Sequence, residues 1–260
     1  MNRPALLAHA AIVAVLALLP AGDAVAQNAV KVCTRPAAGF FAKDRNGTAR
    51  GLEYDILSSF GQSASIVVHL RDTPSFDQAL KDTESGTCDI GSATITITKE
   101  RQERVLFSVP YFPNRILIVQ KSSSTFATEA DLKGKRVAAV TGTVSAPLVA
   151  AIPGATPVAV ANDDASFTAL LNGDVDALAC DSAVVLDFLK KNPELGMAFP
   201  IGERSFFGFA FPKGSTLVAP FNEHIRKLLR TGEMKKLLAK HFGAANAGML
   251  EDDIAEAAGK

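Results

Sequence analysis

The chain has 260 residues, of which 48% are hydrophobic and 21% charged, and its 27 basic side chains balance 27 acidic ones. This composition excludes an intrinsically disordered chain, which has few apolar residues and a large charge imbalance. A neutral chain also lacks the basic surface that binds a phosphate backbone, so we expect no nucleic-acid partner. Three cysteines are too few for a scaffold built from disulfides. One or two globular domains with a sizeable core are therefore expected.

Residues 1–26 have the pattern of a secretory signal peptide. An apolar run covers residues 5–19, and Ala24 and Ala26 place small side chains where signal peptidase cleaves. The run is shorter than the roughly 20 residues that a helix needs to span a bilayer. We expect cleavage before Gln27 and a periplasmic location for the mature chain.

Export affects the interpretation of Cys33, Cys88 and Cys180. In an oxidising compartment two of them can form a disulfide, and the sequence does not select the pair. All three lie in apolar, strand-like runs, where free thiols pack as small hydrophobic side chains. We favour three buried free thiols.

Hydrophobic periodicity predicts that strands and helices alternate along the chain. The expected strands cover residues 30–33, 66–70, 89–93, 117–119, 136–140, 157–160, 177–180 and 206–211. The expected helices cover residues 52–60, 76–83, 167–171, 184–191, 221–229 and 234–238. This alternation indicates two α/β units, each with a mostly parallel sheet, and a ligand cleft at the carboxyl ends of the strands. After Gly243 the sequence is rich in Ala, Gly and acidic residues, and we expect a mobile tail.

The sequence contains no recognisable catalytic or metal-binding motif. It lacks a Gly-x-Ser-x-Gly elbow, a His-Glu-x-x-His pair, a phosphate-loop lysine motif and a Gly-x-Gly-x-x-Gly loop. The histidines after residue 26, which are His69, His224 and His241, do not have the spacing of metal ligands, so no metal or cofactor is expected. The acidic runs at residues 163–164 and 251–253 are interpreted as solvated charge.

Arg101 suggests an anion site. Thr98 is a good N-cap for a helix that begins at Lys99, and Arg101 takes the position where a capping box has Glu or Gln. A cation at the positive end of a helix dipole costs about 0.3–1 kcal/mol. An anion bound there reverses that cost, because helix N-termini and guanidinium groups both donate to carboxylates. From the residues alone, an anion site and an arginine in solvent both stay open.

A series of short segments, in one order, covers nearly all of the chain after residue 26. It resembles the amino-acid-type extracellular solute-binding proteins of ABC importers, which form bacterial extracellular solute-binding protein family 3. The segments are residues 51–56, 86–90, 94–101, 105–111, 131–137 with 142–143, 173–177 with 181, and 208–242.

The resemblance implies the periplasmic binding protein type II fold. This fold has two lobes, each a mostly parallel sheet flanked by helices, joined by two hinge crossings. Residues 27–114 and 206–242 would form the first lobe and residues 115–205 the second, followed by a flexible tail at residues 243–260.

The resemblance also implies a site for a zwitterion. Arg101 would bind the α-carboxylate of the ligand, together with the Thr96 hydroxyl and backbone donors near Thr143. Asp181 would bind the α-ammonium, assisted by acceptors around Thr94. On sequence pattern alone, the favoured interpretation of Asp181 is a turn-forming residue at the end of a strand.

Three further residues complete the implied pocket. Phe76 would form an apolar wall. Small residues at 37–39 occupy the usual position of an aromatic lid, so stacking on the ligand would come from Phe40, from Phe41 or from no residue, and Phe40 is included in the predicted site. Arg35 stands where binders of basic amino acids place an acid. This argues against lysine- or arginine-type ligands and for an acidic or polar one.

The implied function is the capture of a small amino acid or related carboxylate by a monomer that delivers it to an ABC permease in the inner membrane. Closure would occur about hinges near residues 115–118 and 205–209. One alternative is a periplasmic cyclohexadienyl-type dehydratase of the same fold, with Glu53 or Asp181 as general acid. Another is a non-transport sensor or accessory protein with a degenerate cleft. Residues 51–56 also resemble the sensor-like lobes of membrane-bound lytic murein transglycosylases, whose separate lysozyme-like domain we do not expect here.

Overall fold

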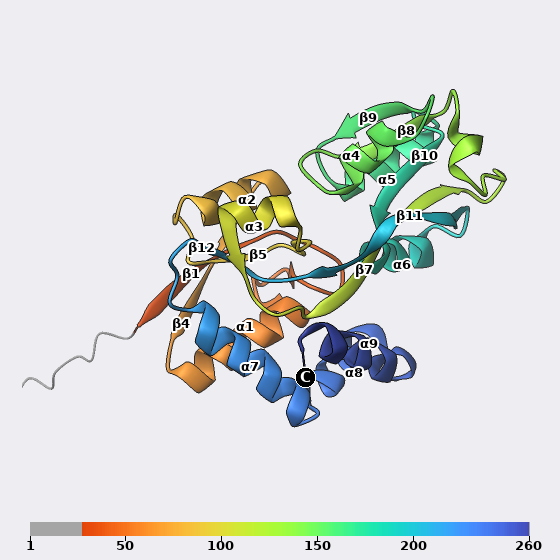
Figure 1. Cartoon of the computed structure of the whole chain (residues 1–260). Helices are drawn as coiled ribbons and strands as arrows, with labels where there is room; N and C mark the ends of the chain where they lie inside the picture. Colours follow the sequence, from red (N-terminus) through yellow and green to blue (C-terminus); the bar gives the residue numbers. More distant parts are fainter. Residues whose placement is uncertain (1–27, 260) are drawn as a thin grey trace, which may run out of the picture.

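Two α/β lobes joined by a pair of long strands form the part of the chain that the structure describes (Figure 1). The structure is a computed structural model and describes residues 28–259. The predicted signal peptide at residues 1–26 lies outside the described residues. The predicted α/β class is confirmed, and it follows from the alternation of strand and helix periodicity in the sequence.

The first lobe contains a five-stranded sheet in the order β4-β1-β5-β12-β6. Its strands are β1 (Ala29–Thr34), β4 (Val67–Asp72), β5 (Ile90–Ser92), β6 (Val105–Phe107) and β12 (Ala210–Pro212). Its helices are α1 (Leu52–Ala64), α2 (Phe76–Glu84), α3 (Lys99–Arg104), α7 (Val218–Arg230) and α8 (Glu233–Phe242), and a small hairpin joins β2 (Ala42–Lys43) to β3 (Ala49–Arg50). Strand β1 runs parallel to β4 and β5, whereas β12 returns antiparallel between β5 and β6.

The second lobe contains a five-stranded sheet in the order β11-β7-β10-β8-β9. Its strands are β7 (Phe112–Lys121), β8 (Arg136–Val140), β9 (Thr156–Val160), β10 (Ala177–Asp181) and β11 (Leu195–Phe207). Its helices are α4 (Ser145–Ala151), α5 (Asp163–Asn172) and α6 (Ser182–Lys191), with a 3-10 turn at Glu129–Leu132. Strand β8 is parallel to β9 and β10, and β7 pairs antiparallel with β10 and β11.

Strands β7 and β11 cross from one lobe to the other as an antiparallel pair. Phe112 and Phe207 pack in the core of the first lobe, whereas Ile116 and Ile201 pack in a core of the second. The register of the pair shifts between Ile201 and Ser205, which interrupts the ladder between the two cores. Among the described residues, this two-stranded ribbon is the sheet structure that runs from one lobe to the other.

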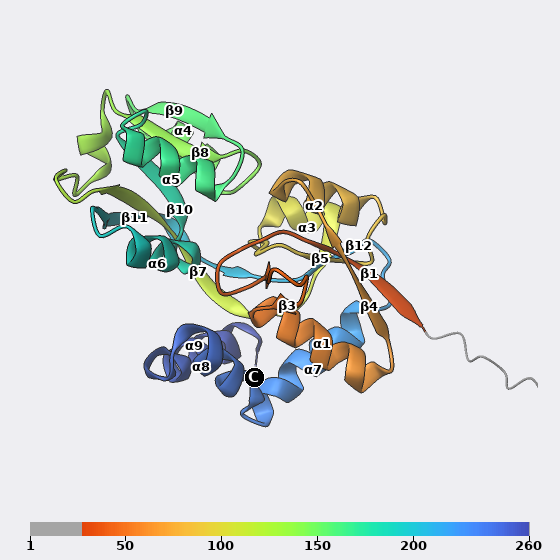
Figure 2. The same cartoon turned by 180° about the vertical axis from the view of Figure 1, so that it is seen from behind.

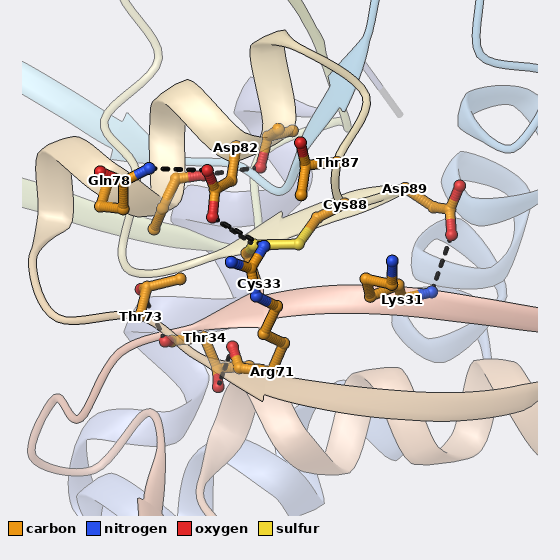
Figure 3. Close-up of a disulfide and its surroundings, with 12 residues drawn as sticks. Lys31, Cys33, Thr34, Arg71, Thr73, Gln78, Asp82, Thr87, Cys88 and Asp89 are labelled. Atoms are coloured by element: carbon orange, nitrogen blue, oxygen red, sulfur yellow. Dashed lines mark hydrogen bonds and ion pairs between the residues drawn. A yellow bond between two sulfur atoms is a disulfide. The ribbon is translucent and has the colours of Figure 1, made fainter.

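Cys33 and Cys88 form a disulfide, so the expectation of three free thiols is wrong for these two residues (Figure 3). Cys33 lies on β1 and Cys88 two residues before β5, and because these strands are neighbours their Cα atoms lie 5.7 Å apart. That separation is within the range that a disulfide bridges. Arg71 and Asp82 form an ion pair of 2.8 Å beside the bond. Cys180 is free and buried, as expected.

Residues 244–257, for which we expected a mobile tail, form helix α9 (Ala244–Ala257). It packs beside α8 and against β7, below the crossing strands in Figures 1 and 2. Ala247, Ile254 and Ala255 are buried in the core of the first lobe. The hydrophobic face of α9 consists mostly of alanines, which give weak periodicity in a sequence that is rich in alanine throughout. Asp253 on α9 forms an ion pair with Arg204 on β11.

Candidate functional site

A cavity of about 10 Å³ lies between the two lobes. Its lining comes from the carboxyl ends of strands, where open α/β sheets bind ligands. Arg35 follows β1, Thr94 follows β5, Val140 ends β8 and Asp181 ends β10. The lining residues are Arg35, Phe76, Thr94, Thr96, Arg101, Val140, Thr143, Val144, Ser145, Asp163, Ala179, Cys180 and Asp181.

Arg101 spans the gap between the lobes and is only 5% exposed. Thr98 caps helix α3 by accepting a hydrogen bond from the Arg101 N–H at 3.2 Å, which confirms the predicted N-cap. The guanidinium donates from Nη1 to the Thr96 carbonyl at 2.9 Å and from Nη2 to the Gly142 carbonyl, on the opposite lobe, at 3.2 Å. It also lies over the ring of Phe76, 4.8 Å from the centroid.

The charge of Arg101 is not paired. No ion pair among the described side chains includes this guanidinium, and burial lowers the pKa of Arg101 to about 10. Two neutral carbonyls and an aromatic face partly replace the water that it has lost. A buried cation without a counter-ion is costly, and the cost falls when an anion binds beside it.

Asp181 lies across the cavity on the second lobe. It directly precedes α6, but its side chain makes no capping hydrogen bond to that helix. Instead it accepts a hydrogen bond from the Asn114 amide. Burial and the charge of Asp163 raise the pKa of Asp181 to about 6, against the opposing effects of Asn114, Arg35 and Arg101. Asp181 therefore lines the cavity with a buried carboxylate that does not cap the helix that follows it.

Arg35 and Asp163 join the two lobes directly. Both Nη1 and Nη2 of Arg35 donate to Oδ2 of Asp163 at 3.3 Å. The other oxygen, Oδ1, accepts a hydrogen bond from the Cys180 thiol at 3.7 Å. The interpretation of Asp163 as solvated charge is wrong, because Asp163 begins α5 at the edge of the cavity, where Arg35 comes within reach from the first lobe. Its neighbour Asp164 is exposed.

Phe40 does not line the cavity, so its expected role in stacking on a ligand is wrong. It is fully buried in the aromatic core of the first lobe, edge-on to Phe112 at 4.9 Å and to Phe207 at 5.6 Å between ring centroids. The loop after β1 folds back through a bridge between Ala37 and Phe41, and this turns Phe40 inward. Phe76 is the aromatic residue of the lining, as expected for an apolar wall.

Glu53 does not line the cavity but supports its edge. Its carboxylate is fully buried and accepts hydrogen bonds from the Ser92 hydroxyl at 3.0 Å, the Thr94 N–H at 2.8 Å and the Tyr111 hydroxyl. Burial raises the pKa of Glu53. This residue is therefore a poor candidate for a general acid acting on a bound molecule, since its oxygens are engaged behind the site.

The two lobes also approach each other at Gly142, next to Thr143 of the cavity lining. This residue has a φ of +79°, and a Cβ placed on it would lie 3.2 Å from the Cβ of Asp77 on α2. A larger residue at this position would both strain the backbone and separate the lobes. Together with the Arg35–Asp163 ion pair and the Arg101–Gly142 hydrogen bond, this contact joins the two lobes in a closed arrangement.

The remaining predicted residues also line the cavity. Thr96 contributes its carbonyl to Arg101, and the Thr143 hydroxyl bonds to the Val140 carbonyl and to the Ser145 hydroxyl at 2.7 Å. Sequence reasoning missed Asp163, Ser145 and Cys180. Cys180 and Ser145 adjoin segments already singled out, at Asp181 and at residues 142–143, so proximity in sequence was the available signal. For Asp163, the only signal in the sequence was its position at the start of a helix.

Comparison with known proteins decides the family. The sequence model of bacterial extracellular solute-binding proteins, family 3, matches residues 30–244. The chain belongs to this family. The match ends at Ala244, the first residue of α9, so the family model does not extend along this helix.

Individual relatives agree with the family. A probable histidine-binding protein of Neisseria gonorrhoeae is 28% identical over 213 residues, which is 79% of each chain. The crystal structure of an arginine-, lysine-, histidine-binding protein of Geobacillus stearothermophilus is 28% identical, with a TM-score of 0.77 over 83% of this chain and 96% of that one. These similarities confirm the predicted periplasmic binding protein type II fold.

A more distant relative matches the second resemblance found in the sequence. Membrane-bound lytic murein transglycosylase F of Pseudomonas syringae pv. tomato is 23% identical over 225 residues, covering 82% of this chain but 45% of the relative. Within residues 28–259, no helix is long and apolar enough to cross a membrane, and no three His, Cys, Asp or Glu side chains are grouped to hold a metal ion.

Proposed function

We propose that this protein is a periplasmic solute-binding protein that captures a small amino acid or related carboxylate between its lobes for ABC-type import. The observation that carries this proposal is the unpaired, buried charge of Arg101 at the lobe interface. A ligand carboxylate would supply the missing counter-ion. Family membership and the amino-acid-binding relatives support the same class of ligand.

Asp181 supports the assignment of a zwitterion rather than a simple anion. Its carboxylate lies on the lobe opposite Arg101, and burial and the charge of Asp163 raise its pKa, so a bound cation would stabilise its ionised form. An α-carboxylate on Arg101 and an α-ammonium on Asp181 would each neutralise a buried charge. Phe76 would cover the apolar side of such a ligand.

Binding would be coupled to closure. We propose that the hinge lies in β7 and β11 between the two cores, where the ladder is interrupted. A ligand held by Arg101 from one lobe and Asp181 from the other binds the closed state better than the open one. It therefore shifts the population toward closure. The closed monomer would then dock on its permease.

The dehydratase alternative has one observation in its favour. The pKa of Asp181 is about 6, which suits a general acid near neutral pH. Glu53, the other candidate, does not line the cavity. Product formation from a cyclohexadienyl carboxylate by the purified protein, lost in Asp181→Asn, would establish this alternative.

A thermal-shift screen over amino acids and small carboxylates tests the proposal. A ligand present at 1,000 times its Kd adds about 4 kcal/mol of stability. Arg101→Ala is expected to weaken the best ligand by at least about 100-fold, since an unpaired partner in a desolvated ion pair costs 3–5 kcal/mol. The matched control is Arg104→Ala on the same helix, because Arg104 is exposed and pairs with Glu84 at 2.9 Å.

The outcomes of this screen separate the alternatives. Equal affinity in wild type and Arg101→Ala would overturn the anion site. No stabilisation by any compound, together with co-purification of a partner protein, would favour the sensor or accessory role instead.

A further inference from the structure

Four charged side chains line the cavity, and their pairing limits what it can hold. Arg35 and Arg101 come from the first lobe, and Asp163 and Asp181 from the second. This inference rests on the proposed function, in which Arg101 and Asp181 bind the two charges of a zwitterion. Arg35 and Asp163 are then the two charged side chains that remain. Those two are already paired with each other across the lobes at 3.3 Å.

This pairing leaves no carboxylate for a cationic ligand side chain. Asp163 has one oxygen on Arg35 and the other on the Cys180 thiol. A lysine- or arginine-type ligand would have to displace Arg35, which is 8% exposed and lies 6.0 Å from the ring centroid of Phe76. The guanidinium of the chain itself therefore fills the place beside Asp163 that such a side chain needs.

The guanidinium of Arg35 also has a donor left over. The cavity of about 10 Å³ admits about one water molecule, so any amino acid must move the lining residues apart, and the volume itself does not discriminate between ligands. The Nε of Arg35 is buried without a hydrogen-bond partner, and both Nη atoms share a single carboxylate oxygen. Arg35 thus has an unused donor, which a short side chain with an acceptor oxygen would satisfy.

We propose that Arg35 is the specificity-determining residue of the cleft. It pairs with Asp163, excludes cationic side chains and favours an amino acid with a neutral or acceptor-bearing side chain. Removing Arg35 should uncover Asp163 and enlarge the cavity, which would convert the site to one that accepts a basic amino acid.

Isothermal titration with L-arginine and L-lysine tests this exchange. Arg35→Ala is expected to bind one of them at least about tenfold more tightly than wild type, because a buried carboxylate has lost its partner. The double variant Arg35→Ala/Asp163→Asn should lose that gain. Arg35→Lys, which keeps a cation beside Asp163, should not gain it. Circular dichroism establishes that each variant is folded.

Asp163→Asn removes the other partner of the ion pair, and it provides a second test if Arg35→Ala does not fold. The asparagine amide is neutral and leaves the Arg35 guanidinium without a counter-ion. The affinity for L-aspartate should therefore be at least about tenfold higher than in wild type. Unchanged affinities in both folded variants, or wild type that binds L-arginine as tightly as Arg35→Ala, would overturn the role of Arg35.

The failure of this inference is distinguishable from failure of the proposed function. If wild type binds an amino acid in an Arg101-dependent manner but neither variant changes the preference for charge, only the role of Arg35 is lost. If no amino acid binds wild type, Arg35→Ala or Asp163→Asn, both are lost.

Discussion

Glu53 holds Thr94 in a backbone conformation that threonine rarely adopts. Its Oε1 accepts a hydrogen bond from the Thr94 N–H at 2.8 Å, and Thr94 has a φ of +51°. A β-branched residue in the left-handed region is strained and persists only when its surroundings fix it. The chain turns here from β5 toward Thr96, which binds Arg101. The buried carboxylate thus positions one edge of the cavity without lining it.

Glu53→Ala is expected to lower the free energy of unfolding by about 3 kcal/mol or more. The substitution leaves the Thr94 N–H and the hydroxyls of Ser92 and Tyr111 buried without their acceptor, at about 1–3 kcal/mol each before relaxation. Glu53→Gln keeps an acceptor oxygen and should cost less. Urea unfolding of the three proteins measures both effects, and a loss below about 0.5 kcal/mol in Glu53→Ala would contradict this role.

Ligand affinity is expected to fall at acidic pH because of Asp181. With a pKa of about 6, this carboxylate is ionised in roughly one molecule in ten at pH 5. If only the ionised form binds an α-ammonium, affinity at pH 5 is about tenfold weaker than at pH 7.5. Titrations of wild type should show this change. Asp181→Asn should bind more weakly at neutral pH and vary little over the same range.

The same group should affect the stability of the unliganded protein in the opposite sense. Its pKa is raised in the folded state, so the folded protein holds this proton more tightly than the unfolded chain does. The contribution of Asp181 to stability is therefore lost as pH rises from about 4 to about 6. Asp163, Arg35, Arg101 and the Asn114 amide surround it and set the size of the effect. Asp181→Asn should gain more stability relative to wild type at pH 7.5 than at pH 4.5.

The disulfide between Cys33 and Cys88 is expected to contribute about 2–4 kcal/mol to stability. It closes a segment with a sequence separation of 55 residues, and cross-links of that length restrict the unfolded chain substantially. The double variant Cys33→Ala/Cys88→Ala should therefore unfold at lower urea concentration. In denaturant without reductant, iodoacetamide should label only Cys180. Three labelled cysteines in the oxidised protein would show that the bond is absent.

Local sequence patterns predicted the fold and one part of the site. The buried positions Leu52, Ile56, Leu57 and Phe60 recur at helical spacing and form α1 as expected, because burial and periodicity have the same cause. Arg101 was found because a cation beside the cap at Thr98 breaks a local rule. Such conflicts between local preference and sequence are typical of functional positions.

Features that depend on long-range contacts were not predicted. Asp163 and Arg35 are 128 residues apart, and nothing local distinguishes an acid that meets a buried guanidinium from one in solvent. The pairing of Cys33 with Cys88 depends on strand order, which the sequence does not state. Phe40 was misplaced because an aromatic residue beside a cleft and one in the adjacent core have the same local pattern.

Helix α9 provides a test of whether the end of the chain is part of the fold. Ile254 is fully buried against the first lobe, so Ile254→Ala should lower the free energy of unfolding by about 2–4 kcal/mol. Asp253→Ala should cost no more than about 1 kcal/mol, since its partner Arg204 is half exposed and such ion pairs are weak. Met249→Ala, at a position 62% exposed on the same helix, is the matched control and should change little. Equal stability of Ile254→Ala and Met249→Ala in urea unfolding would show that α9 does not pack on the lobe in solution.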